Sequence, residues 1–119
     1  MPVFKLNEET STVMGGEPTQ KTWYASDTLT TASTSTNVYL MPTGIRYVVA
    51  SATPSAGVTG YIEYTLSSLD QINSNTANWR AWDNGVVNAY SDITFNPPTA
   101  LRLVMVGGAG TIKMEIKAG

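Results

Sequence analysis

The feature that most constrains this chain is an alternation of apolar and polar residues with a period of two, which is the period of a β-strand. In residues 111–117 (TIKMEIK), Ile112, Met114 and Ile116 share one face, and polar residues occupy the other. The same alternation runs through residues 44–52, 60–66 and 100–106. A strand with one buried and one solvated face has this pattern, so we expect an all-β, antiparallel chain.

Glycine and proline divide the chain into short segments, as turns between strands require. Further strand candidates are residues 3–6, 21–25, 37–41, 86–90 and 93–95. The sequence GGAG (107–110) joins the last two strands and predicts a terminal hairpin. Short strands at this spacing predict one antiparallel β-sandwich of about eight strands over residues 1–119, jelly-roll-like or Ig-like.

Two segments depart from the strand pattern. Residues 7–20 (NEETSTVMGGEPTQ) contain few apolar side chains, so a long surface loop is the favoured interpretation, with an extended N-terminal arm at about residues 1–20 as the alternative. Residues 67–76 (SSLDQINSNT) could form one helical turn after a serine cap, with Leu69 and Ile72 on one side. A loop crossing between strands is the favoured interpretation.

The composition argues against several functions. Charged residues make up 13% of the chain, against about 25% in ordinary soluble domains, and the net charge is −2. The seven basic residues are scattered, so we expect no binding to nucleic acid, which needs clustered Lys and Arg. No apolar run approaches the length of about 18 residues that spans a bilayer, so we expect no membrane segment.

The chain contains neither cysteine nor histidine. Disulfides, thiolate metal sites, cysteine nucleophiles and Ser-His-Asp machinery are therefore excluded. The sequence DNG (83–85) lacks the further oxygen ligands of a calcium loop, and Asn and Gly instead favour a tight turn. We expect no enzymatic activity, no cofactor and no metal.

The aromatic residues are the remaining candidates for a site. In the segment NWRAWDNGVV, strand geometry places Trp79 on one face and Arg80 and Trp82 on the other. We expect Trp79 to face inward and Trp82 to lie near a contact surface. Trp23 and Tyr24 are adjacent, so only one of them can face the core. The candidate interaction residues are Trp82, Arg80, Trp23 and Tyr24, and the alternatives are burial under loops, a protein contact or a sugar-stacking platform.

Three elements of the C-terminal half carry a family resemblance: the strand YIEYT, the Trp-x-x-Trp pair before a glycine turn, and the closing segment GTIKME. From about Gly57 to Lys117, the sequence resembles small β-sandwich virion proteins of tailed bacteriophages, of the type that decorates or cements the head shell. Related sandwich modules also occur in tail and fibre proteins. The N-terminal half shares only a threonine-rich β character with this family.

The resemblance implies a non-enzymatic structural protein that is made in the bacterial host cytoplasm and incorporated into the virion. Its partners would be the major capsid protein or other virion proteins, and it would form a homo-oligomer, with a trimer as the first choice. A subunit that binds only the assembled shell would stabilise it by mass action. The alternative function is a carbohydrate- or receptor-binding module of a phage tail or fibre, which the surplus of aromatic residues favours.

Overall fold

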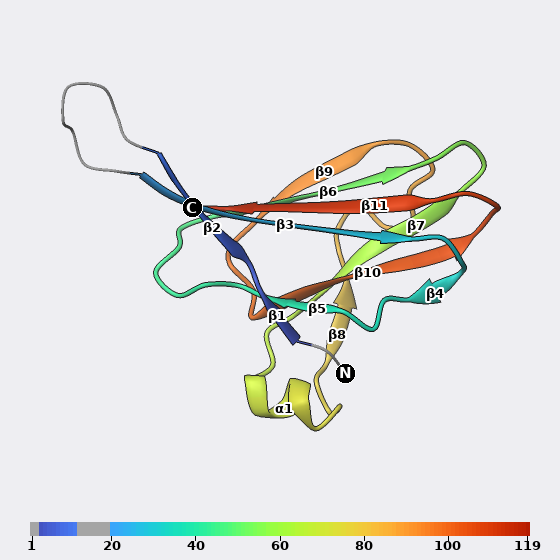
Figure 1. Cartoon of the computed structure of the whole chain (residues 1–119). Coiled ribbons are helices and arrows are strands. Elements are labelled where there is room, and N and C mark those ends of the chain that lie inside the picture. The colour runs from blue at the N-terminus through green and yellow to red at the C-terminus, as the bar shows by residue number, and fades with distance from the viewer. Residues whose placement is uncertain (1–2, 12–19) are drawn as a thin grey trace.

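The computed structural model describes residues 3–11 and 20–119, which form two β-sheets packed face to face (Figure 1). In spatial order, the first sheet contains β1 (Val3–Lys5), β5 (Val38–Leu40), β10 (Ala100–Gly107), β7 (Thr59–Thr65) and β8 (Trp79–Ala81), with β4 (Ser33–Thr34) paired to β10. The second sheet contains β2 (Asn7–Ser11), β3 (Gln20–Leu29), β11 (Ile112–Ala118), β6 (Val48–Pro54) and β9 (Ser91–Phe95). The predicted all-β sandwich is confirmed, although the described residues form eleven strands rather than about eight.

The period-two faces meet between the two sheets and form the core. From the first sheet, β10 contributes its alternate residues Leu101, Leu103 and Met105; from the second sheet, β11 contributes Ile112, Met114 and Ile116, and β6 contributes Val48, Ala50 and Ala52. All nine side chains are at most 2% exposed. The predicted apolar faces of residues 100–106 and 111–117 are therefore confirmed as the inner faces of two different sheets.

Residues 107–110 do not close a terminal hairpin, and that prediction is wrong. They carry the chain from the first sheet to the second, because β10 pairs with β4, β5 and β7 whereas β11 pairs with β3 and β6. Gly108 has a φ of 102°, and a Cβ there would collide with the carbonyl oxygen of Gly57. Glycine is required at this position, both for the left-handed backbone and for the close approach of the two turns.

The described part of the N-terminal segment belongs to both sheets, within the range for which a surface loop or an extended arm was expected. β1 runs parallel to β5 at the edge of the first sheet, and β2 pairs in an antiparallel manner with β3 in the second sheet. Leu6 lies between β1 and β2 and is buried in the core at 7% exposure. The segment thus joins the two layers at one edge. Residues 12–19 of the predicted arm lie outside the described residues.

The segment 67–76 forms a short helix, α1 (Leu69–Asn73), rather than the favoured crossing loop. The Ser68 side chain accepts a hydrogen bond from the Gln71 backbone N–H, and the Gln71 side chain accepts one from the Ser68 backbone N–H. This capping box starts the helix, and Ile72 anchors it because its side chain is only 1% exposed. Within residues 3–11 and 20–119, no helix has the length and apolar character needed to cross a bilayer.

Candidate functional site

Trp82, the leading candidate for a contact surface, is buried in the core at 2% exposure, so its predicted position is wrong. The backbone N–H of Trp82 donates to the carbonyl oxygen of Ile62 at 2.8 Å, which continues the pairing of β8 with β7. Its indole Nε1–H donates to the carbonyl oxygen of Gly85 at 2.7 Å, across the turn formed by the DNG sequence. Trp82 therefore fills the space between the sheets and has its polar atom satisfied there.

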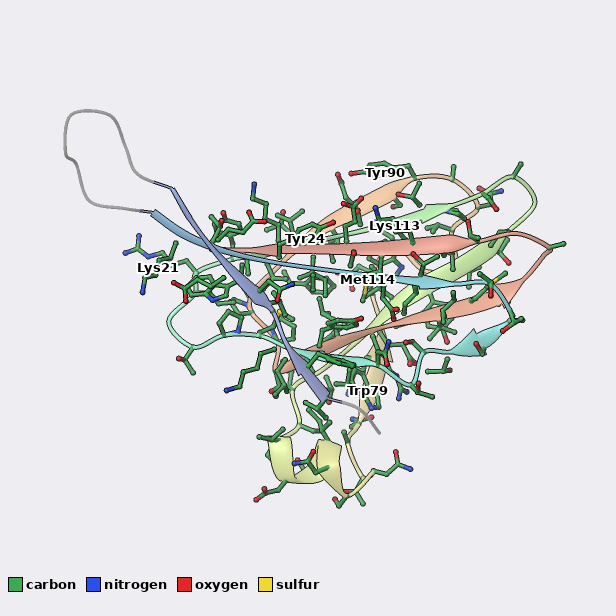
Figure 2. All side chains as sticks on the ribbon, viewed as in Figure 1. Lys21, Tyr24, Trp79, Tyr90, Lys113 and Met114 are labelled. Atoms are coloured by element: carbon green, nitrogen blue, oxygen red, sulfur yellow. The ribbon has the colours of Figure 1, made fainter. Side chains whose placement is uncertain are left out.

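Trp79 lies on the opposite face of β8, as strand geometry predicted, but this is the outer face of the first sheet. It pairs with Thr65, and the Arg102 guanidinium lies 4.1 Å from the centre of its ring. Arg102 Nε is also 2.7 Å from Glu63 Oε1. Trp79 is half-buried and packs on a second apolar cluster that includes Ile72 of α1 (Figure 2). The segment around α1, and not the second sheet, covers Trp79, which corrects the expectation that it faces inward.

The remaining candidates point in three different directions. Trp23 faces the interior, packs partly buried against the core, and lines a cavity of about 390 Å³ with Leu6 and Met41. Tyr24, its neighbour in β3, lies on the outer face of the second sheet. Arg80 is exposed on β8, at the edge of the first sheet. The structure therefore does not bring Trp82, Arg80, Trp23 and Tyr24 together into one site.

Tyr24 does belong to a shallow hollow of about 440 Å³ on the outer face of the second sheet. We call it the tyrosine hollow, and its polar lining residues are Glu9, Tyr24, Ser51, Tyr90, Glu115 and Lys117. The strand register builds its floor, because Tyr24 on β3 pairs with Lys117 on β11, and Glu115 on β11 pairs with Ser51 on β6. Four strands and a loop thus supply one continuous patch.

Hydrogen bonds to carboxylates hold both tyrosines of the hollow. The Tyr24 hydroxyl donates to Glu115 Oε2 at 2.9 Å, and Lys113 Nζ lies 3.9 Å from the same oxygen. The Tyr90 hydroxyl donates to Asp92 Oδ2 at 2.9 Å, and this hydrogen bond raises the pKa of Tyr90 above its ordinary value. Figure 2 shows Tyr24, Tyr90 and Lys113 on the outer side of the second sheet, with Met114 between the sheets.

Sequence reasoning missed Tyr90 because it assigned residues 86–90 to a strand. In the structure, this segment is a loop that makes one isolated bridge, from Val87 to Gly60, before β9 begins at Ser91. The loop leaves Tyr90 62% exposed beside the outer face of the second sheet. The available signal was that Asp92 follows Tyr90 by two residues. This spacing does not indicate a site unless the loop geometry is known.

A second exposed feature is the end of the hairpin formed by β2 and β3. Residues 20–22 of β3 pair with residues 9–11 of β2, whereas β11 reaches only to Ala118, opposite Trp23. We call these six residues the projecting ribbon, which extends past the sandwich in Figure 1. Lys21, in the middle of one ribbon strand, has its Nζ 3.6 Å from Glu8 Oε1, and both side chains are exposed.

The tyrosine hollow and the projecting ribbon offer shape and hydrogen-bonding groups for binding. Among the residues that the structure describes, no group of three His, Cys, Asp or Glu side chains lies close enough together to hold a metal ion. Comparison with protein families, curated proteins and solved structures finds no significant match to this chain. The resemblance to phage virion proteins therefore stays a prediction.

Proposed function

We propose that this chain is a non-enzymatic structural protein of a tailed-phage virion, a decoration or cement subunit that stabilises the head shell. The observation that carries the proposal is the projecting ribbon. A two-stranded ribbon is at best marginally stable in water unless another surface packs on it. Within the described residues, the ribbon backbone pairs only within the ribbon, and Lys21 and Thr22 share a hollow with Arg46, Tyr47 and Gly119 of the same chain. The open strand edges of the ribbon are therefore what a neighbouring subunit would pair with.

The chemistry of the ribbon suits contact with another protein chain. A strand edge presents N–H and C=O groups that can pair with an extended segment of a partner. The low charge of the whole chain, 13% of residues, also agrees with a surface that neighbours cover, because interface cores are depleted in charge. The partner would be the major capsid protein, or a second copy of the chain within a small oligomer.

The alternative drawn from the sequence, a glycan- or receptor-binding module of a tail or fibre, loses most of its original basis. It relied on an aromatic surplus at the surface. Trp82 is buried, Trp79 is half-buried under the α1 segment, and Trp23 faces the interior. Of those aromatic residues, only Tyr24 lies on an outer sheet face that the α1 segment does not cover.

Sedimentation with expanded empty heads of the bacteriophage that encodes the chain tests the proposal, and light scattering gives the oligomeric state. We expect saturable binding to expanded heads and raised thermal stability of the shells, since a ligand that binds only the assembled state stabilises it. Absence of binding to these heads would overturn the proposal.

A matched pair of charge reversals locates the contact. Lys21→Glu changes the projecting ribbon, and Lys113→Glu makes the same change on the outer face of the second sheet. Both lysines are exposed strand residues within 4 Å of a glutamate, at 3.6 and 3.9 Å. We expect Lys21→Glu to weaken binding to heads and Lys113→Glu to leave it unchanged. Equal effects of the two variants would argue against the ribbon as the contact.

A further inference from the structure

We propose that the tyrosine hollow binds an uncharged glycan, with its sugar rings lying against Tyr24 and Tyr90. This function goes beyond the proposed structural role and does not depend on it, because the hollow lies on the outer face of the sheet, apart from the projecting ribbon. Three observations support the proposal: the shape of the hollow, the two tyrosine rings oriented by hydrogen bonds, and the presence of both hydrogen-bond donors and acceptors.

The hollow has the dimensions and openness of a surface site. Its volume of about 440 Å³ falls in the range of roughly 300–1,000 Å³ that is typical of small-molecule sites. Its floor is the backbone of three paired strands, β3, β11 and β6, which is a rigid support. A rigid floor lowers the ordering cost that a binding site on a mobile loop would incur.

The two tyrosines are held before any ligand arrives. Tyr24 is tied to Glu115 and Tyr90 to Asp92, each through a hydroxyl-to-carboxylate hydrogen bond of 2.9 Å. Each ring therefore has a preferred orientation although Tyr90 is 62% exposed. The face of an aromatic ring carries partial negative charge and attracts the weakly positive C–H groups on the flat side of a sugar ring.

The polar groups around the rings match the hydroxyls of a sugar, each of which both donates and accepts. Glu115 accepts one hydrogen bond from Tyr24, and a carboxylate has further lone pairs to offer. Glu9 adds a second acceptor, Lys117 adds a donor, and the Ser51 hydroxyl can act in either direction. The hollow therefore offers both kinds of partner within one patch.

The charge balance of the hollow disfavours other ligand classes. Glu9, Glu115 and Lys117 line the hollow, Asp92 accepts the hydrogen bond from Tyr90, and Lys113 lies 3.9 Å from Glu115, so acidic groups outnumber basic ones. A phosphate, a nucleic acid or an acidic sugar would meet net repulsion. A purely apolar ligand would cover these charged groups without replacing their hydrogen bonds, which is costly. A basic peptide is the competing ligand that the test has to distinguish.

The experiment screens the full chain against an array that contains neutral and sialylated oligosaccharides, followed by titration calorimetry with the neutral oligosaccharide that gives the strongest signal. A Lys/Arg-rich peptide is titrated in parallel. We expect binding of a neutral oligosaccharide with weaker or no binding of its sialylated form and of the peptide. A silent array, or a preference for the sialylated form or the peptide, would overturn the proposal.

Three variants assign the binding to the hollow. Tyr90→Ala removes an exposed ring and is expected to weaken binding at least about tenfold, while Tyr24→Phe keeps the ring and removes only the hydroxyl that Glu115 holds. The control is Tyr47→Ala, which removes a partly exposed tyrosine that does not line the hollow. Equal affinity of the Tyr90→Ala and Tyr47→Ala variants would refute the site. Binding of Tyr90→Ala to phage heads, measured separately, should equal that of the unmodified protein.

Discussion

Replacement of Trp82 with alanine is expected to lower the free energy of unfolding by about 3–5 kcal/mol, the cost of removing a large buried aromatic side chain. Trp82 is 2% exposed and packs in the cluster between the sheets. The truncation would leave a cavity there, and the surrounding strands cannot close it without breaking their backbone hydrogen bonds. Since a domain of ordinary stability unfolds at a cost of about 5–15 kcal/mol, this is a large part of the total.

Two further variants divide that loss into its causes. Trp82→Phe keeps an aromatic ring but removes the indole N–H that donates to the Gly85 carbonyl oxygen at 2.7 Å. A hydrogen bond contributes about 0.5–1.5 kcal/mol net, so this variant should fall between the unmodified protein and Trp82→Ala. Trp79→Ala is the matched control, because Trp79 belongs to the same segment but is only half-buried, against Arg102 and the α1 segment. Its loss should be smaller than that of Trp82→Ala.

Urea unfolding followed by far-ultraviolet circular dichroism measures these differences without relying on the tryptophan fluorescence that the variants remove. The free energy of unfolding comes from the midpoint and the slope of each transition. A loss below about 0.5 kcal/mol for Trp82→Ala is typical of exposed positions and would refute its placement in the core. A larger loss for Trp79→Ala than for Trp82→Ala would refute the assignment of the two faces of β8.

Three other predictions follow from single contacts. Gly60→Ala should lower the free energy of unfolding by about 1–3 kcal/mol through overpacking, because a Cβ at residue 60 would lie 2.5 Å from a carbonyl oxygen of β10. At Gly107 the nearest atom to an added Cβ would be 4.0 Å away, so Gly107→Ala should be close to neutral in the same urea experiment. Ser68→Ala should cost about 1 kcal/mol in that experiment by removing the cap of α1. Tyr90 should ionise at a higher pH in the folded than in the unfolded chain, because its neutral hydroxyl donates to Asp92. The stabilisation of the folded state by this hydrogen bond is present below the unfolded-state pKa and is lost as the pH rises through the raised folded-state pKa. The difference in phenolate absorbance between the unmodified protein and Tyr90→Phe measures this pKa, which Asp92→Ala should lower.

The strands that supply most of the core could be predicted because the period of two is a local property of extended backbone. Residues 101, 103 and 105 and residues 112, 114 and 116 all point inward, as their alternation indicated. Alternation does not specify the sheet that a strand joins. An inner apolar face is equally compatible with a hairpin in one sheet and with a crossing between two sheets, so the role of residues 107–110 depended on pairing partners far away in the sequence.

The faces of β8 illustrate a second limit. Strand geometry correctly separated Trp79 from Trp82, but their orientation was reversed. The assumption behind the prediction was that only one face of a sheet is apolar. Here α1 covers part of the outer face of the first sheet and forms a second small cluster with Val38 and Ala100. One face therefore buries Trp82 and the other half-buries Trp79, and the packing of the second sheet decides which face belongs to the main core.

The tyrosine hollow shows why a site on a sheet face is harder to predict than the core beneath it. Its residues come from β2, β3, β6, β11 and the loop before β9, and the strand register, not any sequence spacing, makes Tyr24 a neighbour of Lys117. Taken singly, each polar strand residue of the hollow is an ordinary residue on the solvated face of a strand. The sequence-based prediction placed Trp82 near a contact surface because the aromatic residues were expected to be too many for the interior. The interior does contain Trp82. A ligand site on a sandwich is instead built from the outward residues that such reasoning assigns to solvent, so its chemistry becomes visible only when the register aligns them.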